Sequence, residues 1–344
     1  MSQAPAVSLA DVAARAGVSP ATASRVLSNS PHPVADSTRQ RVLSAAATLD
    51  FVPNLVARNL AVRRTGTFGV IVHDMTDEYF AQIARGIEDV AYAAGRATLI
   101  CNSDRRPDKE LAYVRKLRSM HVDAMVFTGS GLGDDAYQAA LQPQLDQFTA
   151  AGGVVVRLAP SPGRPADVRW PTGEGYAAAV SHLTALGHRR FGFVCGPDLL
   201  PSSHERRAAA TAALAAHGLA LSTVLVGDYT RHGGVRAAAA LLAGGGRNRP
   251  TAVLAANDQL AIGLQAGLRA HGVAVPGDMS VVGFDDVPAC TFVEPALTTI
   301  RVPLYDVGAT GARIAIERLD GNRPAAVTLG LELVVRASTA PPSR

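Results

Sequence analysis

The sequence is poor in cysteine and in aromatic residues. It has 3 cysteines, and aromatic residues make up 5% of its 344 positions. Cys101, Cys195 and Cys290 are isolated and odd in number, and the first two lie in apolar, strand-like runs. We expect reduced, packed thiols, which excludes a disulfide framework or a zinc site built on cysteines. Few aromatics with 48% hydrophobic residues are typical of an α/β protein rich in Ala and Val.

Long hydrophobic runs are also missing. The most apolar stretch, 212–227, is interrupted by polar residues and glycine, so no run reaches the roughly 20 residues that a transmembrane helix needs. The N-terminus does not show the basic segment followed by an apolar segment that is typical of a signal peptide. We therefore expect no membrane segment and a cytoplasmic location.

Positive charge is concentrated at the N-terminus. The chain has a formal net charge of +4, and residues 1–64 contain seven Arg and three Asp, so the rest of the chain is neutral. A basic first fifth on a neutral body is the electrostatic pattern of a DNA-binding head.

Residues 8–28 are predicted to form two short helices joined by a tight turn. Ser8 and Asp11 make a capping-box pattern, with Asp in place of the usual Glu. Gly17 follows the first helix, where a left-handed residue ends a helix at little cost, and Ser19 is an N-cap directly before a proline. Apolar residues recur at three- and four-residue spacing and form the inner faces: Val12, Ala13, Ala16, Ala23, Val26 and Leu27.

The outer face of the second helix is the candidate DNA-binding surface. Helix-turn-helix units place the start of their second helix against base edges in the major groove. Arg25 suits a guanine edge, and serine and threonine hydroxyls suit phosphates. A plain helical hairpin with a solvated Arg accounts for these residues equally well. The candidates are Ser19, Pro20, Ala21, Thr22, Ser24 and Arg25.

This stretch resembles the N-terminus of the LacI/GalR family of bacterial transcription regulators. The shared pattern is Leu9-x-Asp11-Val12-Ala13-x-x-Ala16-Gly17-Val18-Ser19-x-x-Thr22-x-Ser24-Arg25-Val26-Leu27. Ala23 and Ser28 depart from the family's usual Val and Asn, and the loop at 29–34 is about one residue longer than is typical of the family.

Two further helical segments complete the head. Residues 36–49 are predicted to form a third helix with Val42, Leu43, Ala46 and Leu49 as its buried stripe. We assign 1–50 to the helix-turn-helix domain and 51–65 to a linker.

The linker is predicted to contain a short helix that begins after Asn54 and ends near Val62. About nine residues are too few for a helix that is stable alone in water. The family resemblance implies a hinge helix that pairs across a dimer and inserts Leu60, with Ala57 beside it, into the minor groove, where apolar wedges are known to act. The alternative is a linker helix with Leu60 packed internally.

From Thr67 onward strands and helices alternate. Strands are expected at 68–72, 97–101, 122–127, 153–158, 190–195, 223–226, 252–255 and 280–284. Helices are expected at 79–94, 107–120, 134–151, 203–217, 233–243 and 259–271. Such alternation predicts parallel sheets, and two runs of it predict two doubly wound subdomains.

The resemblance implies a core like that of periplasmic binding proteins, with three crossings between the two subdomains. We assign 66–185 and 302–325 to the first and 186–301 and 326–344 to the second. Residues 305–319 are expected to return to the first subdomain and 327–335 to the second.

Polar residues follow several predicted strands, where ligands bind in open α/β sheets. Each one alone is better explained as a cap or turn residue, but together, at the mouths of two facing sheets, they favour a polar cleft. Tyr79, Phe80 and the single Trp could equally be packing residues. The resemblance implies effector contacts at Arg206, Asn257 and Asp285. Pro171-Thr172 departs from the family's common Asp-Asn, which leaves the effector open. The candidate effector-binding residues are Asp74, Tyr79, Phe80, Ser130, Trp170, Arg206, Asn257 and Asp285.

These patterns favour a sequence-specific transcription regulator. We expect a repressor that binds a near-palindromic DNA operator as a homodimer and is controlled by a small molecule of the sugar or nucleobase class, with a sugar favoured. The alternative is a two-lobed solute-binding protein, against which the basic head argues. An enzyme is disfavoured, because residues 129–133 have the wrong glycine spacing for a phosphate loop and the histidines have no metal spacing. We expect no cofactor and no metal.

Overall fold

A computed structural model describes residues 7–27, 32–51, 65–244 and 249–343. The chain divides into two compact units, Met1–Thr65 and Gly66–Arg344. The predicted hinge residues Asn54, Ala57 and Leu60 lie outside the described residues.

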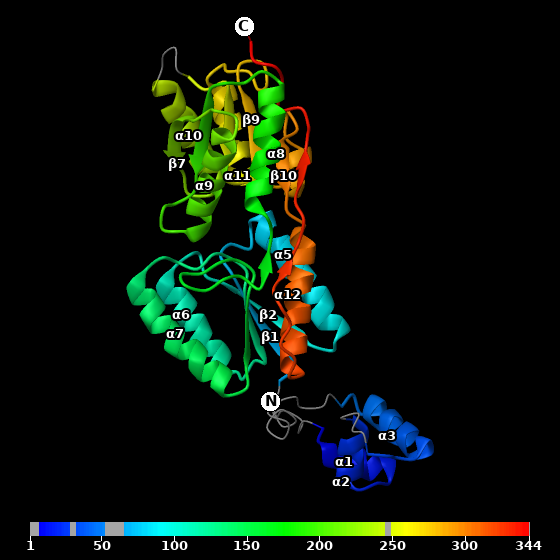
Figure 1. The fold of residues 1–344 in the computed structure, drawn as a ribbon. Coiled ribbons are helices and arrows are strands. Elements are labelled where there is room, and N and C mark those ends of the chain that lie inside the picture. The colour runs from blue at the N-terminus through cyan, green and yellow to red at the C-terminus, as the bar shows by residue number, and fades with distance from the viewer. Residues whose placement is uncertain (1–6, 28–31, 52–64, 245–248, 344) are drawn as a thin grey trace, which may run out of the picture. The chain divides into compact units, whose positions relative to one another are not determined.

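In the described part of the first unit, three helices surround a small core. They are α1 (Leu9–Ala16), α2 (Pro20–Leu27) and α3 (Asp36–Thr48), blue in Figure 1. The buried residues are Val12, Ala13, Ala16, Ala23, Val26, Val42, Ala45 and Ala46. The prediction that Leu43 is buried was wrong: its side chain is 44% exposed. Adjacent helical residues point about 100° apart, so Ala45 and Ala46, not Leu43, share the face of Val42.

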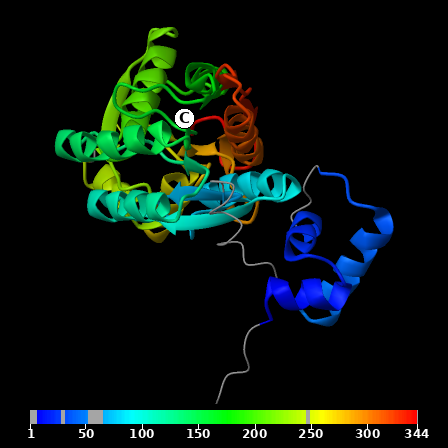
Figure 2. The same ribbon diagram turned by 90° about the horizontal axis from the view of Figure 1, so that it is seen from below.

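The first sheet of the second unit is parallel, with strand order β2-β1-β3-β4. Its strands are β1 (Thr67–Val72), β2 (Ala97–Asn102), β3 (Ala124–Phe127) and β4 (Val154–Arg157). Helices α6 (Pro107–Ser119) and α7 (Asp135–Ala150) pack together on one side of it. Helices α5 (Glu78–Ala93) and α12 (Leu304–Leu319) pack together on the other side (Figures 1 and 2).

The second sheet has the order β12-β10-β9-β8-β6-β7, with only β12 antiparallel to its neighbour. Its strands are β6 (Phe191–Cys195), β7 (Leu221–Val226), β8 (Ala252–Ala255), β9 (Ser280–Asp285), β10 (Thr298–Arg301) and β12 (Glu332–Val334). Helix α8 (Thr172–Ala185) packs on α9 (Pro201–Ala215), and α10 (Arg231–Ala243) packs on α11 (Asp258–Ala270). The predicted fold of two doubly wound subdomains is confirmed, and we call them the first and second lobes.

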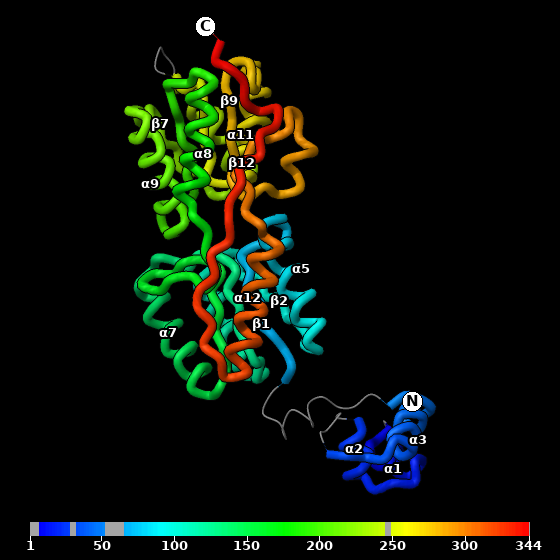
Figure 3. The backbone as a smooth tube through the Cα atoms, turned by 45° about the vertical axis from the view of Figure 1, so that its right-hand side comes forward, coloured from blue at the N-terminus to red at the C-terminus, as the bar shows by residue number. Residues whose placement is uncertain are grey.

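The crossings between the lobes differ in detail from the prediction. Residues 327–335 form two short strands: β11 (Val327–Thr328) pairs with β5 (Val168–Arg169), and β12 joins the second sheet. Helix α8 contacts α9, β10 and β12, so the assignment of residues up to 185 to the first lobe is corrected to a crossing near 170–172. Figure 3 follows the last crossing, from α12 back to β12.

Helices α5 and α12 pack with their backbones in close contact. A Cβ atom added at Gly86 would lie 2.1 Å from the carbonyl oxygen of Tyr305, and one added at Gly308 would lie 2.0 Å from that of Ile83. Only glycine fits at these two points, so the first lobe is held together by a tight helix pair. Within the described residues, no helix has both the length and the apolar character needed to span a membrane.

Candidate functional site

The helix-turn-helix predicted at the N-terminus is built from the expected local interactions. The Ser8 backbone N–H donates to Asp11 Oδ2 at 2.8 Å, and the Asp11 N–H donates to Ser8 Oγ at 3.3 Å. The Ser8 hydroxyl also donates to Asp11 Oδ2, at 2.7 Å, and this bond together with the one from the Ser8 N–H lowers the pKa of Asp11. Gly17 ends α1 in the left-handed region with φ 64°. The Thr22 N–H donates to Ser19 Oγ at 3.2 Å, so Ser19 caps α2 as predicted.

The six described candidates for DNA contact are the N-cap of α2 and five residues of its first two turns. Pro20, Ala21, Ser24 and Arg25 are exposed, whereas Ala23 and Val26 are buried. Ser19 is exposed and Thr22 is half-buried, and their hydroxyl oxygens lie 2.9 Å apart. The arrangement exposes an Arg and small side chains on the same face of the helix.

A pocket lies between the two lobes of the second unit, at the carboxyl ends of both sheets. It encloses about 630 Å³ of space between protein atoms, and this volume includes open solvent. Seven of the eight predicted effector residues line it: Tyr79, Phe80, Ser130, Trp170, Arg206, Asn257 and Asp285. The pocket is lined in addition by His73, Asp77, Arg105, Gly129, Ala159, Pro160, Thr172, Leu200, Ser202, Glu205 and Tyr229.

Asp74, the eighth predicted effector residue, does not line this pocket. Its carboxylate accepts from the Thr76 N–H at 2.9 Å and from the Thr76 hydroxyl at 2.7 Å, so its hydrogen bonds lie within its own turn. Asp77 lines the pocket instead. It is the N-cap of α5 and accepts from the Tyr79 N–H at 3.1 Å.

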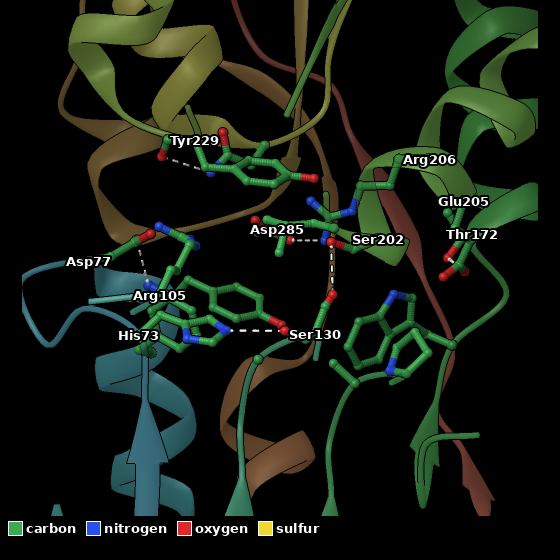
Figure 4. Close-up of a pocket in the computed structure, with 18 residues that line it drawn as sticks. His73, Asp77, Arg105, Ser130, Thr172, Ser202, Glu205, Arg206, Tyr229 and Asp285 are labelled. Atoms are coloured by element: carbon green, nitrogen blue, oxygen red, sulfur yellow. Dashed lines mark hydrogen bonds and ion pairs between the residues drawn. The ribbon is translucent and has the colours of Figure 1, made fainter. Parts of the chain in front are cut away.

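A buried ion pair forms the second-lobe side of the pocket. Arg206 Nη2 lies 2.9 Å from Asp285 Oδ1, and both side chains are less than one-tenth exposed. The guanidinium also donates to the Ala256 carbonyl and stacks 4.1 Å from the centroid of the Phe284 ring. Figure 4 shows the pair projecting into the pocket. The contacts with Asp285, the Ala256 carbonyl and the Phe284 ring together fix the orientation of the guanidinium.

The backbone and the protonation of Asp285 are both unusual. Its φ is 115°, a conformation that residues with a side chain rarely adopt and that is concentrated at functional sites. Burial acts to raise the pKa of Asp285, and the adjacent Arg206 guanidinium acts to lower it. Burial likewise raises the pKa of the neighbouring Asp258 to about 7. Asp258 accepts from Thr299 Oγ1 at 2.5 Å and from the Val287 N–H at 2.9 Å.

The first-lobe side of the pocket is aromatic. The Phe80 ring meets His73 edge-on at 5.4 Å between centroids and Tyr79 edge-on at 4.9 Å. His73 Nε2 lies 3.2 Å from the Ser130 carbonyl oxygen. Burial lowers the pKa of His73 to about 4, so the imidazole is neutral and Nε2 carries its proton.

Arg105 is a pocket residue that the sequence analysis missed. Its guanidinium carbon lies 5.9 Å from the Phe80 ring centroid in its own lobe and 5.7 Å from the Tyr229 ring centroid in the other lobe. Its Nε is buried and has no hydrogen-bond partner among the residues that the structure describes. Arg105 follows β2, so the rule used for the other strand ends, applied to β2, would have found it.

Direct hydrogen bonds join the two lobes across the pocket. The Gln259 side-chain amide donates to Asp77 Oδ1 at 3.1 Å, and Ser130 Oγ donates to Ser202 Oγ at 3.2 Å. Asn257 accepts from the Leu260 N–H at 2.9 Å and caps α11 beside them. The structure therefore shows the lobes in contact around the pocket.

Fold and site together define a class: a helix-turn-helix head joined to a two-lobed core with a ligand pocket between its lobes. Two family descriptions match: "Bacterial regulatory proteins, lacI family" at residues 8–54 and "Periplasmic binding protein-like domain" at 180–339. The chain belongs to the LacI family of bacterial regulatory proteins and is a DNA-binding transcription regulator. The head that matches at 8–54 argues against a pure solute-binding protein.

Individual relatives align over almost the whole chain. The transcriptional regulator GalR of Escherichia coli is 35% identical over 91% of this chain and 89% of its own. Catabolite control protein A of Priestia megaterium is 33% identical over 90% and 91%. The crystal structure of the lac repressor dimer bound to operator and the anti-inducer ONPF superposes with a TM-score of 0.85, at 28% identity, over 98% of this chain and all of that one.

Proposed function

We propose that this protein binds a near-palindromic operator as a homodimer, and that an uncharged sugar in the inter-lobe pocket controls this binding. Repression is the favoured outcome, because the solved lac repressor dimer, which is bound to operator and an anti-inducer, is similar along nearly the whole chain. We propose binding, not catalysis, as the role of the pocket. The protein acts in the cytoplasm, where the DNA is.

The single observation that carries the sugar assignment is the charge balance of the pocket. Its ionisable carboxylates are Asp77, Glu205 and Asp285, and its cations are Arg105 and Arg206. The pocket therefore has no positive excess with which to hold a phosphate or a carboxylate. Fixed hydrogen-bonding groups between aromatic walls instead suit the hydroxyls and the apolar faces of a sugar.

DNA recognition is assigned to α2. Arg25 reads a base edge, and Ser19, Thr22 and Ser24 contact phosphates, while Pro20 and Ala21 allow close approach to the groove. Asn54, Ala57 and Leu60 remain the predicted hinge contacts, with Leu60 as a minor-groove wedge.

The proposal is tested by selecting operator sequences from random duplexes with the purified full chain. We expect saturable, sequence-selective binding that weakens steeply with salt, and a change in operator affinity when a sugar is added. Arg206→Ala is expected to leave operator affinity unchanged and to remove the sugar response. Selective binding that no sugar affects would refute the effector assignment alone, whereas the absence of any sequence preference would refute the DNA-binding assignment.

A further inference from the structure

A second hollow adjoins the inter-lobe pocket and shares one wall with it. It encloses about 600 Å³ between protein atoms, again partly open to solvent. Pro160, Trp170 and Glu205 line both hollows. We call it the side groove, and its lining residues are Leu158, Pro160, Pro165, Ala166, Val168, Arg169, Trp170 and Glu205.

The side groove has an apolar floor and flat walls. Leu158, Ala166 and Val168 are buried, with 0%, 5% and 0% of their surface exposed. The rings of Trp170 and of two prolines complete the lining. An apolar surface of this kind suits the C–H face of a pyranose ring.

Two charged groups of opposite sign lie at the groove. Arg169 Nε donates to the Ala166 carbonyl at 2.9 Å, which holds the guanidinium beside the floor. Glu205 Oε1 accepts from Thr172 Oγ1 at 2.6 Å. The other carboxylate oxygen of Glu205 makes no hydrogen bond within the described part of the chain, so it is available to a ligand hydroxyl. Like the inter-lobe pocket, the side groove has no excess of positive charge, so it favours an uncharged ligand.

We propose that the effector has two sugar rings, as a disaccharide does. One ring lies at Arg206 and Asp285 in the inter-lobe pocket, and the second lies in the side groove against Trp170. This inference rests on the proposed function, because it extends the same ligand. Glu205 belongs to the second lobe, whereas Leu158 follows the last strand of the first sheet, so the second ring adds contacts to both lobes.

The experiment is isothermal titration calorimetry of the full chain with glucose, galactose, cellobiose, lactose and maltose. We expect at least one disaccharide to bind about tenfold more tightly than its constituent monosaccharides, a difference of about 1.4 kcal/mol. Ala166→Leu fills the floor of the groove without touching the inter-lobe pocket. It is expected to reduce disaccharide affinity to that of the monosaccharide and to leave monosaccharide affinity unchanged.

Two further variants keep the result interpretable. Ala213→Leu, on α9 at 7% exposure, makes the same substitution at a buried alanine that lines neither hollow, and it is expected to leave both affinities unchanged. If Ala166→Leu does not fold, Arg169→Ala takes its place, because Arg169 is exposed and lines only the groove; it is expected to weaken disaccharide binding selectively.

The outcomes separate this inference from the proposed function. Monosaccharides that bind as tightly as every disaccharide would overturn the two-ring assignment and leave the proposed sugar site intact. If the groove variants weaken monosaccharide and disaccharide binding equally, the two-ring assignment is also overturned and the proposed sugar site stays intact. Absence of binding by all five sugars would overturn the sugar assignment itself, and the two-ring inference with it.

Discussion

Removal of Arg206 is expected to destabilise the core, and the size of the effect follows from its surroundings. Arg206 and Asp285 are 7% and 3% exposed, and the atoms of their ion pair lie 2.9 Å apart. Removing one partner of a buried pair typically costs about 3–5 kcal/mol, because the other charge stays buried alone. Burial raises the pKa of Asp285 and Arg206 acts to lower it, so a carboxyl left without Arg206 takes up a proton more readily. We therefore expect about 3 kcal/mol for Arg206→Ala at pH 7.

The loss of folding stability caused by Arg206→Ala is expected to depend on pH. Without Arg206, the folded-state pKa of Asp285 rises further above its unfolded value. A raised folded-state pKa stabilises the protein at low pH, and this contribution disappears as pH rises through that pKa. The destabilisation by Arg206→Ala should therefore be larger at pH 9 than at pH 6.

Urea unfolding followed by Trp170 fluorescence measures this effect, since the only Trp of the chain lies in the pocket wall. The double variant Arg206→Met/Asp285→Asn removes both charges and is expected to recover most of the stability. A loss below about 1 kcal/mol, or an equal loss at pH 6 and pH 9, would refute the buried-pair reasoning.

Three further predictions concern other parts of the molecule. Arg25→Ala should weaken binding to the selected operator by about 1–3 kcal/mol and non-specific binding much less, as measured by competition with random duplex; equal weakening of both would make Arg25 a phosphate contact. Burial raises the pKa of Asp258 to about 7, so folding stability is lost as the pH rises through that value. Between pH 5 and pH 8 the melting temperature of the wild type should therefore fall more steeply than that of Asp258→Asn. A constant difference between the two melting temperatures would contradict this. Gly308→Ala places a Cβ 2.0 Å from the Ile83 carbonyl oxygen and should lower the free energy of unfolding, measured in urea, by about 1–3 kcal/mol. Gly173→Ala is the control, because a Cβ at Gly173 meets nothing within 4 Å, and it should not destabilise the protein. Similar losses in both variants would show that packing is not the cause.

Local signals predicted most of the secondary structure. The caps at Ser8 and Ser19 and the left-handed Gly17 depend on neighbouring residues only, so they are visible in the sequence. Helix α8 and strand β10 were missed because their local signals are weak. The first turn of α8 contains two glycines after a proline, and β10 has four residues whose pairing partners are far away in the chain.

The pocket was predicted less completely than the fold. A strand end identifies a neighbourhood, but the turn decides which side chain enters the pocket. Asp74 bonds to Thr76 in its own turn, and Asp77 reaches the pocket three residues later. Tyr229 follows β7 as Arg105 follows β2, so the strand-end rule applied to every strand would have found both. Glu205 lines the pocket from α9, which a rule about strand ends does not cover.

The pairing of β5 with β11 restricts how the lobes can move. The Val327 N–H donates to the Asp167 carbonyl at 2.9 Å, and the Leu329 N–H donates to that of Arg169 at 2.8 Å. Sliding one crossing segment along the other would break these bonds, whereas flexing the ribbon out of its plane keeps them. The pairing therefore opposes sliding of the two crossing segments and favours a hinge-like motion between the lobes.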